Sequence, residues 1–168
     1  MAQKTFVSGD VLTAADTNLY LMHEGGAWTS WTPTWTSLSV GNGTVSALYA
    51  RASRLITWKL KLTFGSTTSV SGGIRFTLPA AASTGVEFDN AFGTFVDASS
   101  SRHLAMSQFI STTTIQVNGM TVTGTSVVSG SDIVSGSGVI QIATTASVPF
   151  TWTTSDQIIF SGVYESLA

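Results

Sequence analysis

The chain has 168 residues, enough for a single domain with a real core, and its composition excludes several classes of protein. Only 10% of the residues are charged, against roughly 25% in an average soluble domain. The net charge of −2 and the pI of about 5.5 argue against a nucleic-acid partner. Cysteine is absent, which excludes disulfides and thiolate metal sites.

No apolar run approaches the ~18 residues of a membrane span. The first residues also lack the apolar segment of a signal peptide. We therefore expect a protein that is made in the cytoplasm, has no visible secretion signal and does not enter a membrane.

Residues 1–26 form a predicted N-terminal arm with a short helix. Thr13 is a good helix cap, Asp16 follows at the position of a favourable first-turn acid, and Gly25-Gly26 end the segment. We expect the arm to dock on its own sheet, on a neighbouring subunit or on a larger particle. Its candidate assembly residues are Leu12, Leu19 and Met22.

Three tryptophans follow within eight residues, at Trp28, Trp31 and Trp35. Pro33 excludes helix and favours an extended or edge segment, so alternation places Trp31 and Trp35 on one side and Trp28 on the other. The three rings could stack on sugar as a candidate glycan site. The favoured interpretation is that they fill a core or a subunit contact, where tryptophan buries a large area.

A β-hairpin is predicted over residues 43–64. Ile56, Trp58, Leu60, Leu62 and Phe64 alternate with polar residues that include Lys59 and Lys61, the pattern of a half-buried strand. Five of the seven basic residues lie between Arg51 and Arg75. We interpret this strip as a solvated sheet face with lysines that protect an edge.

Further short strands are predicted along the rest of the chain, which indicates an all-β fold. We expect residues 27–168 to form one antiparallel, jelly-roll-like β-sandwich. Ile74, Phe76, Leu78 and the final strand through Tyr164 should close the apolar face of the hairpin. The other expected features are strands at 91–96, 104–110, 114–117 and 139–143, a polar loop at 65–73, a tight turn at Asn118-Gly119 and a Gly/Ser-rich loop at 124–138.

Catalytic groups are few. His23 and His103 have no metal-binding spacing, and no nucleophile motif surrounds any serine. Glu87 and Asp89 could share a face and serve glycoside hydrolysis or calcium binding, but exposed acids in a solvated loop are the default. We expect no enzyme, no metal and no cofactor, and keep a glycan-degrading enzyme built on Glu87 and Asp89 as a competing hypothesis.

Three motifs in the same order resemble the tailed-bacteriophage minor tail and tail-fibre-type structural proteins. The first is Phe6–Asn18, the second is Trp31–Trp35 followed by Gly43–Arg51, and the third is Pro149–Glu165. Together they bracket nearly the whole chain. The resemblance implies a virion structural protein with a C-terminal β-sandwich module, commonly a homotrimer, which contacts other virion proteins and in some members host-surface glycans. The open alternative is a capsid decoration or head-fibre protein.

Overall fold

A computed structural model describes residues 7–11, 13, 28–83, 91–123 and 138–167. These residues are all-β, with no helix among them, and every strand pairing is antiparallel. The strands are β1 Thr29–Ser30, β2 Trp35–Ser39, β3 Thr44–Ala52, β4 Leu55–Thr63, β5 Ser69–Thr77, β6 Ala91–Val96, β7 Arg102–Ser111, β8 Thr114–Thr123, β9 Gly138–Ala143 and β10 Gln157–Glu165.

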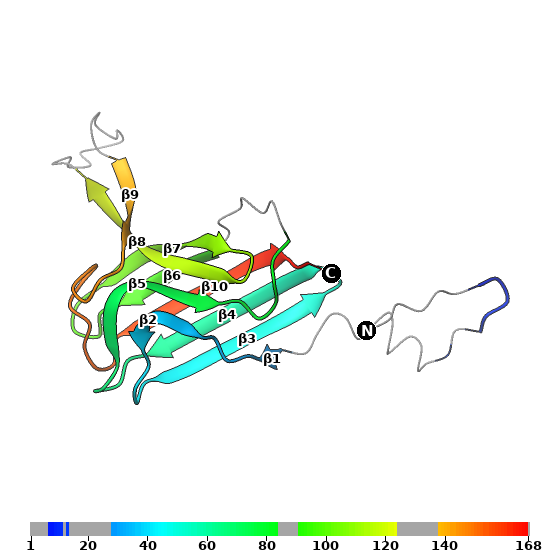
Figure 1. Cartoon of the computed structure of the whole chain (residues 1–168), viewed down its shortest axis with the longest axis horizontal. Helices are drawn as coiled ribbons and strands as arrows, with labels where there is room; N and C mark the ends of the chain where they lie inside the picture. Colours follow the sequence, from blue (N-terminus) through cyan, green and yellow to red (C-terminus); the bar gives the residue numbers. More distant parts are fainter. Residues whose placement is uncertain (1–6, 12, 14–27, 84–90, 124–137, 168) are drawn as a thin grey trace.

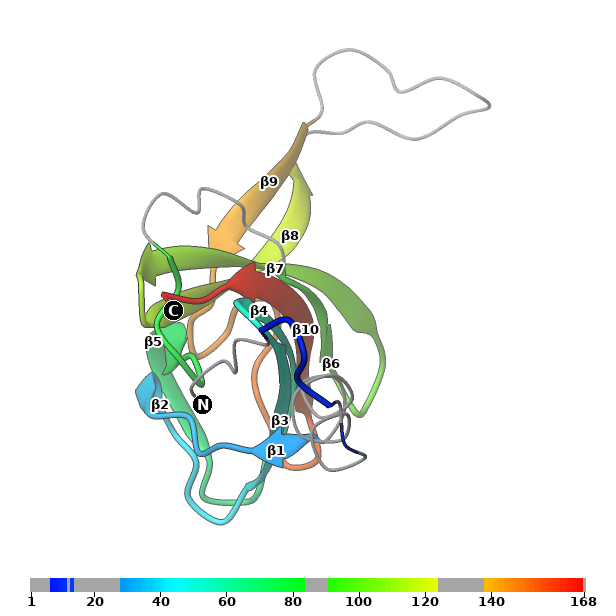
Figure 2. The ribbon, with the colours of Figure 1, turned by 90° about the vertical axis from the view of Figure 1, so that its right-hand side faces the viewer.

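The strands belong to one strongly curled sheet (Figures 1 and 2). Its order is β1-β3-β4-β10-β6-β7-β8-β5-β2, and β9 pairs with β8 off this path. The predicted all-β antiparallel class is confirmed. The finer prediction of a two-sheet, jelly-roll-like sandwich is not, because the curling of one continuous sheet encloses the core.

The two ends of the sheet are tied together by the short connection from β1 to β2. The Trp31 N–H donates to the carbonyl of Ala47 in β3, at 3.1 Å. The Thr77 N–H in β5 donates to the carbonyl of Thr34, also at 3.1 Å. Pro33 lies between them and is buried, so the segment is extended as its proline predicts.

The hairpin of β3 and β4 forms as predicted, with continuous pairing from Thr44↔Thr63 to Ala52↔Leu55. Ser53 at φ 53° occupies the left-handed conformation that a two-residue turn requires. Side chains of β4 alternate strictly between buried and exposed from Leu55 to Leu62. The predicted apolar face is therefore confirmed as core.

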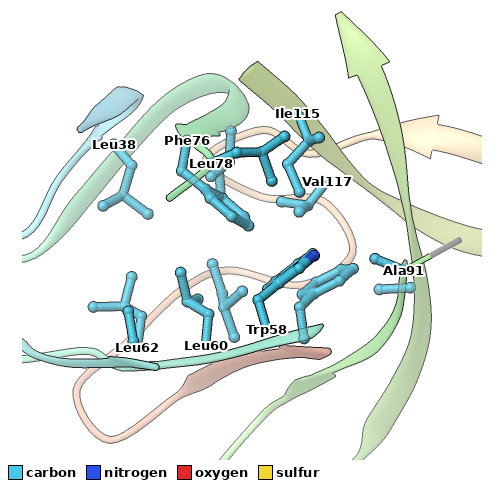
Figure 3. Close-up of a cluster of buried hydrophobic side chains, with 14 of the residues drawn as sticks. Leu38, Trp58, Leu60, Leu62, Phe76, Leu78, Ala91, Ile115 and Val117 are labelled. Atoms are coloured by element: carbon cyan, nitrogen blue, oxygen red, sulfur yellow. The ribbon is translucent and has the colours of Figure 1, made fainter. Parts of the chain in front are cut away.

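That face is covered from across the interior by β5 and β8 (Figure 3). The Phe76 ring meets the Trp58 ring edge-on, with centroids 5.7 Å apart. Burial of each such side chain contributes about 1.5–3 kcal/mol. The last strand takes a different position from the one expected: β10 lies beside β4 in the same sheet, paired from Gln157↔Thr63 to Glu165↔Leu55.

Two polar predictions are wrong. The loop expected at 65–73 is shorter, because β5 already begins at Ser69 and pairs with Ser39 of β2. The tight turn expected at Asn118-Gly119 does not form, since both residues lie inside β8 and pair with β7 and β9. Asn118 is buried and its side-chain oxygen accepts a hydrogen bond from Gln116 Nε2 at 2.9 Å, so its polar group is satisfied within the strand.

Two buried polar side chains fasten loops to the sheet. Asp156 is fully buried, and its carboxylate accepts hydrogen bonds from the backbone N–H groups of Ala98 and Thr153. The Tyr164 hydroxyl donates to the Ala80 carbonyl at 2.7 Å and accepts from the Ala80 N–H at 3.2 Å. Burial raises the pKa of Tyr164 to about 12, although the hydrogen bond from Ala80 opposes the shift.

Several predictions concern residues outside the described ranges. These are the N-terminal helix with Leu12, Leu19 and Met22, the acids Glu87 and Asp89, and most of the Gly/Ser-rich segment at 124–138. Of residues 1–26, the described ones include a turn in which the Asp10 N–H donates to the Val7 carbonyl.

Candidate functional site

The candidate functional site is a shallow trough on the outer face of the sheet, above β10. Its floor is formed by Ile159 and Ser161 of β10. Lys59 and Lys61 of β4 line one side. Phe92 and Thr94 of β6 line the other. The hollow measures about 310 Å³, is open to solvent, and is called the outer trough below.

Strand pairing places these side chains opposite one another. Ser161 pairs with Lys59 on one neighbouring strand and with Phe92 on the other. Paired residues of an antiparallel sheet point to the same face, so a small serine stands between two long side chains. Two residues earlier on β10, Ile159 likewise pairs with Lys61 on one neighbouring strand and with Thr94 on the other.

The inward residues of the same strands are core, which fixes the orientation of the trough residues. Ile158 and Phe160 are buried, so Ile159 and Ser161 between and beside them must face outward. The same alternation at Leu60 and Leu62 turns Lys59 and Lys61 outward. The core thus determines which side chains reach the trough.

Large apolar side chains are exposed in and beside the trough. Phe92 is 63% exposed, and Leu104 of β7, which pairs with Thr94, is 66% exposed. Val163 of β10 is 40% exposed. Strand alternation places these three side chains on the same outer face, and exposed apolar side chains that gather on one face are typical of contact sites for ligands or other proteins.

Trp28 lies at the β4 side of the trough. Its ring is 4.2 Å from the Lys59 ammonium, a cation–π contact. The indole is 45% exposed and sits on the outer side of the sheet with Lys59. Trp28 is therefore available at the surface and holds one of the two lysines in place.

The other two candidate tryptophans lie on the inner side. Trp31 packs edge-on against Trp58, with ring centroids 6.3 Å apart, and its Nε1–H donates to the Thr77 carbonyl at 3.2 Å. Trp35 packs against Phe76, with centroids 5.3 Å apart. Both are partly buried against the core. The three rings therefore do not form one platform, and the alternation predicted for them from the sequence is confirmed.

The lysines differ from their expected setting. We predicted that they protect a sheet edge, but β4 lies in the interior of the sheet, between β3 and β10. Edge protection is therefore the wrong explanation for Lys59 and Lys61.

A second polar cluster lies in the turn between β6 and β7. The Ser101 hydroxyl is 2.9 Å from His103 Nε2, an arrangement that nucleophilic catalysts also use. Asp97 does not orient this histidine, because its oxygens accept hydrogen bonds from Ser99 and Ser100. The Ser99 hydroxyl, then the Ser99 N–H and the Ser100 hydroxyl, lower the pKa of Asp97. These bonds order an exposed turn.

The described ranges contain no group of three or more His, Cys, Asp or Glu side chains that could hold a metal. Within the same part of the chain, no helix is long and apolar enough to cross a membrane. Comparisons with models of known families, with curated proteins and with solved structures found no match to this chain.

The sequence indicated one side of the trough and missed the other. The outward position of Lys59 and Lys61 followed from alternation in β4. Phe92 and Leu104 gave a weaker sequence signal for a surface site. Their strands also carry the core residues Phe95 and Ala105 on the opposite face, which turns Phe92 and Leu104 outward. Outward apolar residues are common on strands, however, so this position alone does not indicate a site. Their proximity to the lysines depends on the insertion of β10 between β4 and β6.

Proposed function

We propose that this chain is a non-catalytic structural protein of a tailed-bacteriophage virion, a peripheral minor tail or fibre-type module that contacts a host-surface glycan. The observation that carries the proposal is the outer trough, an exposed surface that joins apolar, hydroxyl and basic side chains. The virion context comes from the ordered motifs at Phe6–Asn18, at Trp31–Trp35 followed by Gly43–Arg51, and at Pro149–Glu165.

The trough has the composition of a binding surface. Among the described residues that line it, the titratable side chains are the two exposed lysines, and the structure places no carboxylate or imidazole there that could act as a general acid or base. An aromatic ring beside hydroxyls and ammonium groups suits reversible recognition. A rigid sheet supports all of these side chains, which favours a precise contact surface.

We further propose that the module assembles as a homotrimer. With charged residues at 10% and a mean hydropathy of +0.30, the surface has few charges to keep separate copies apart. Light scattering of the purified full chain at micromolar concentration should give three times the monomer mass of 17.6 kDa. A monomeric mass would contradict this part of the proposal.

The virion role is tested on purified particles. An antibody against this chain should label particles in electron micrographs, and labelling at the tail tip supports a tail or fibre module. Absence of the chain from particles would overturn the proposal.

A capsid decoration protein is the second candidate, favoured by the same low charge and by the predicted N-terminal arm. Quantitative gel densitometry distinguishes the two. A decoration protein approaches the copy number of the major capsid protein, whereas a tail or fibre module is present in far fewer copies. Antibody label over the surface of the phage head would also support a decoration protein.

A further inference from the structure

We propose that the outer trough binds an acidic saccharide, a sugar unit of a bacterial surface polysaccharide that carries a carboxylate. This inference rests on the proposed attachment function and specifies its ligand. It assigns the carboxylate to Lys59 and Lys61 and the sugar ring to Phe92.

The charge of the trough favours an acidic ligand. The side chains that share the outer face with the two lysines on the neighbouring strands are neutral: Ser46 on β3, and Ile159 and Ser161 on β10. Opposite them, Phe92 and Thr94 are neutral as well. Among the described residues that line it, the trough therefore carries two positive charges and no acid, and a ligand with a carboxylate complements it.

The nearest acid of β10 on this face is already paired. Glu165 forms an ion pair with Arg54 at 2.9 Å, and in the register it lies opposite Leu55. That position is four residues from Lys59, or roughly 13 Å along the strand. Exposed charges separated by more than about 8–10 Å are largely screened at physiological ionic strength. Glu165 therefore does not neutralise the trough.

The shape of the trough favours a sugar ring. The small Ser161 leaves the floor low between Lys59 and Phe92, and the hollow of about 310 Å³ lies at the lower end of the ~300–1,000 Å³ typical of ligand pockets. Phe92 is 63% exposed and offers a ring to the C–H face of a pyranose, which carries a partial positive charge. The hydroxyls of Ser46, Thr94 and Ser161 provide donors and acceptors for sugar hydroxyls.

Strand pairing disfavours a peptide as the ligand. Peptides commonly bind sheets by adding a strand to an open edge. Here β4 pairs with β3 and β10, and β10 pairs with β4 and β6, so the backbone groups beneath the trough are already bonded. A nucleic acid would need a broader basic surface than two lysines on a chain of net charge −2.

The test uses the full chain and trigalacturonic acid as the probe, with its methyl ester as the neutral control of the same skeleton. Titration calorimetry should detect trigalacturonic acid with a Kd on the order of 1 mM, and the ester should bind at least fivefold more weakly. Lys61→Gln should weaken binding of the acid about threefold to fivefold. Phe92→Ser should weaken both ligands.

Arg102→Gln is the matched control, because Arg102 is exposed on β7 and does not line the trough. This variant should bind as the unchanged protein does, and circular dichroism should show that all three variants are folded. Tetraglutamate tests whether charge alone suffices, and it should bind more weakly than the saccharide.

Four outcomes would overturn the inference: no binding of trigalacturonic acid, equal binding of acid and ester, unchanged binding by Lys61→Gln, or equal binding of tetraglutamate. Any of them leaves the virion proposal standing if the chain is found in particles. If the chain is absent from particles but binds the acid in the trough, the virion proposal fails and the ligand assignment stands.

Discussion

Trp31 meets Trp58 edge-on, at a centroid separation of 6.3 Å and an interplanar angle of 88°. The first ring comes from the connection between β1 and β2, and the second comes from the interior strand β4. The contact therefore fastens the segment that joins the two ends of the curled sheet to its core.

The first prediction separates core tryptophans from surface tryptophans. Trp31→Ala should lower the free energy of unfolding by about 2–4 kcal/mol, because it removes a partly buried ring and the bond to the Thr77 carbonyl. Trp28→Ala should cost about 0.5–1 kcal/mol, the size of an exposed cation–π contact. Urea denaturation measures the free energy of unfolding of both variants. Equal losses of stability would contradict the assignment of Trp31 to the core and Trp28 to the surface.

The second prediction concerns the close approach of β6 to β10. A methyl group at Gly93 would collide with the Ile159 carbonyl and the Phe160 ring, so Gly93→Ala should destabilise the protein by about 1–3 kcal/mol. At Gly119 the nearest atom to such a methyl group is 3.8 Å away, which is ordinary contact. Gly119→Ala is thus the control and should change stability by less than about 1 kcal/mol in thermal unfolding.

The third prediction concerns the buried carboxylate of Asp156. Asp156→Asn should lower the free energy of unfolding by about 1–3 kcal/mol, since an NH₂ group then faces backbone N–H donors at Ala98 or Thr153. Asp97→Asn should have a smaller effect, because the hydrogen bonds of Asp97 lie in an exposed turn. Chemical denaturation of the two variants side by side checks this order, and the reverse order would refute it.

The fourth prediction is an alkaline loss of stability through Tyr164. Its pKa is raised from 10.0 to about 12 in the folded state, so the folded protein holds the phenol proton more tightly than the unfolded chain does. Stability is therefore fully present below pH 10 and falls between pH 10 and 12. The loss should be on the order of 1–2 kcal/mol after partial screening by solvent.

Tyr164→Phe is the control for this titration, since it removes the ionisable hydroxyl and leaves the ring. The variant should be less stable at neutral pH, because the two hydrogen bonds to Ala80 are lost. Its stability should then fall less steeply than that of the unchanged protein above pH 10. If the stability of the two proteins falls equally between pH 10 and 12, Tyr164 does not contribute to the alkaline loss of stability.

Much of the fold could be predicted because buried and exposed side chains alternate along a half-buried β-strand. The alternation from Ile56 to Phe64 predicted the buried face of β4, and the strand expected at 91–96 coincides with β6. Asn118-Gly119 shows where local patterns fail. That pair favours a tight turn in isolation, but pairing with β7 and β9 on both sides holds it extended within β8.

The candidate site, too, could be predicted only in part from the sequence. The sequence by itself determined the all-β class, the inward face of β4 and the outward direction of Lys59 and Lys61, since side-chain direction follows from position along a strand. Only the tertiary structure decided that the sheet curls as one piece and that β10, about a hundred residues later in the chain, lies between β4 and β6. The trough exists because that long-range pairing sets Ser161 between Lys59 and Phe92, and the partner of a strand is not encoded in its own periodicity.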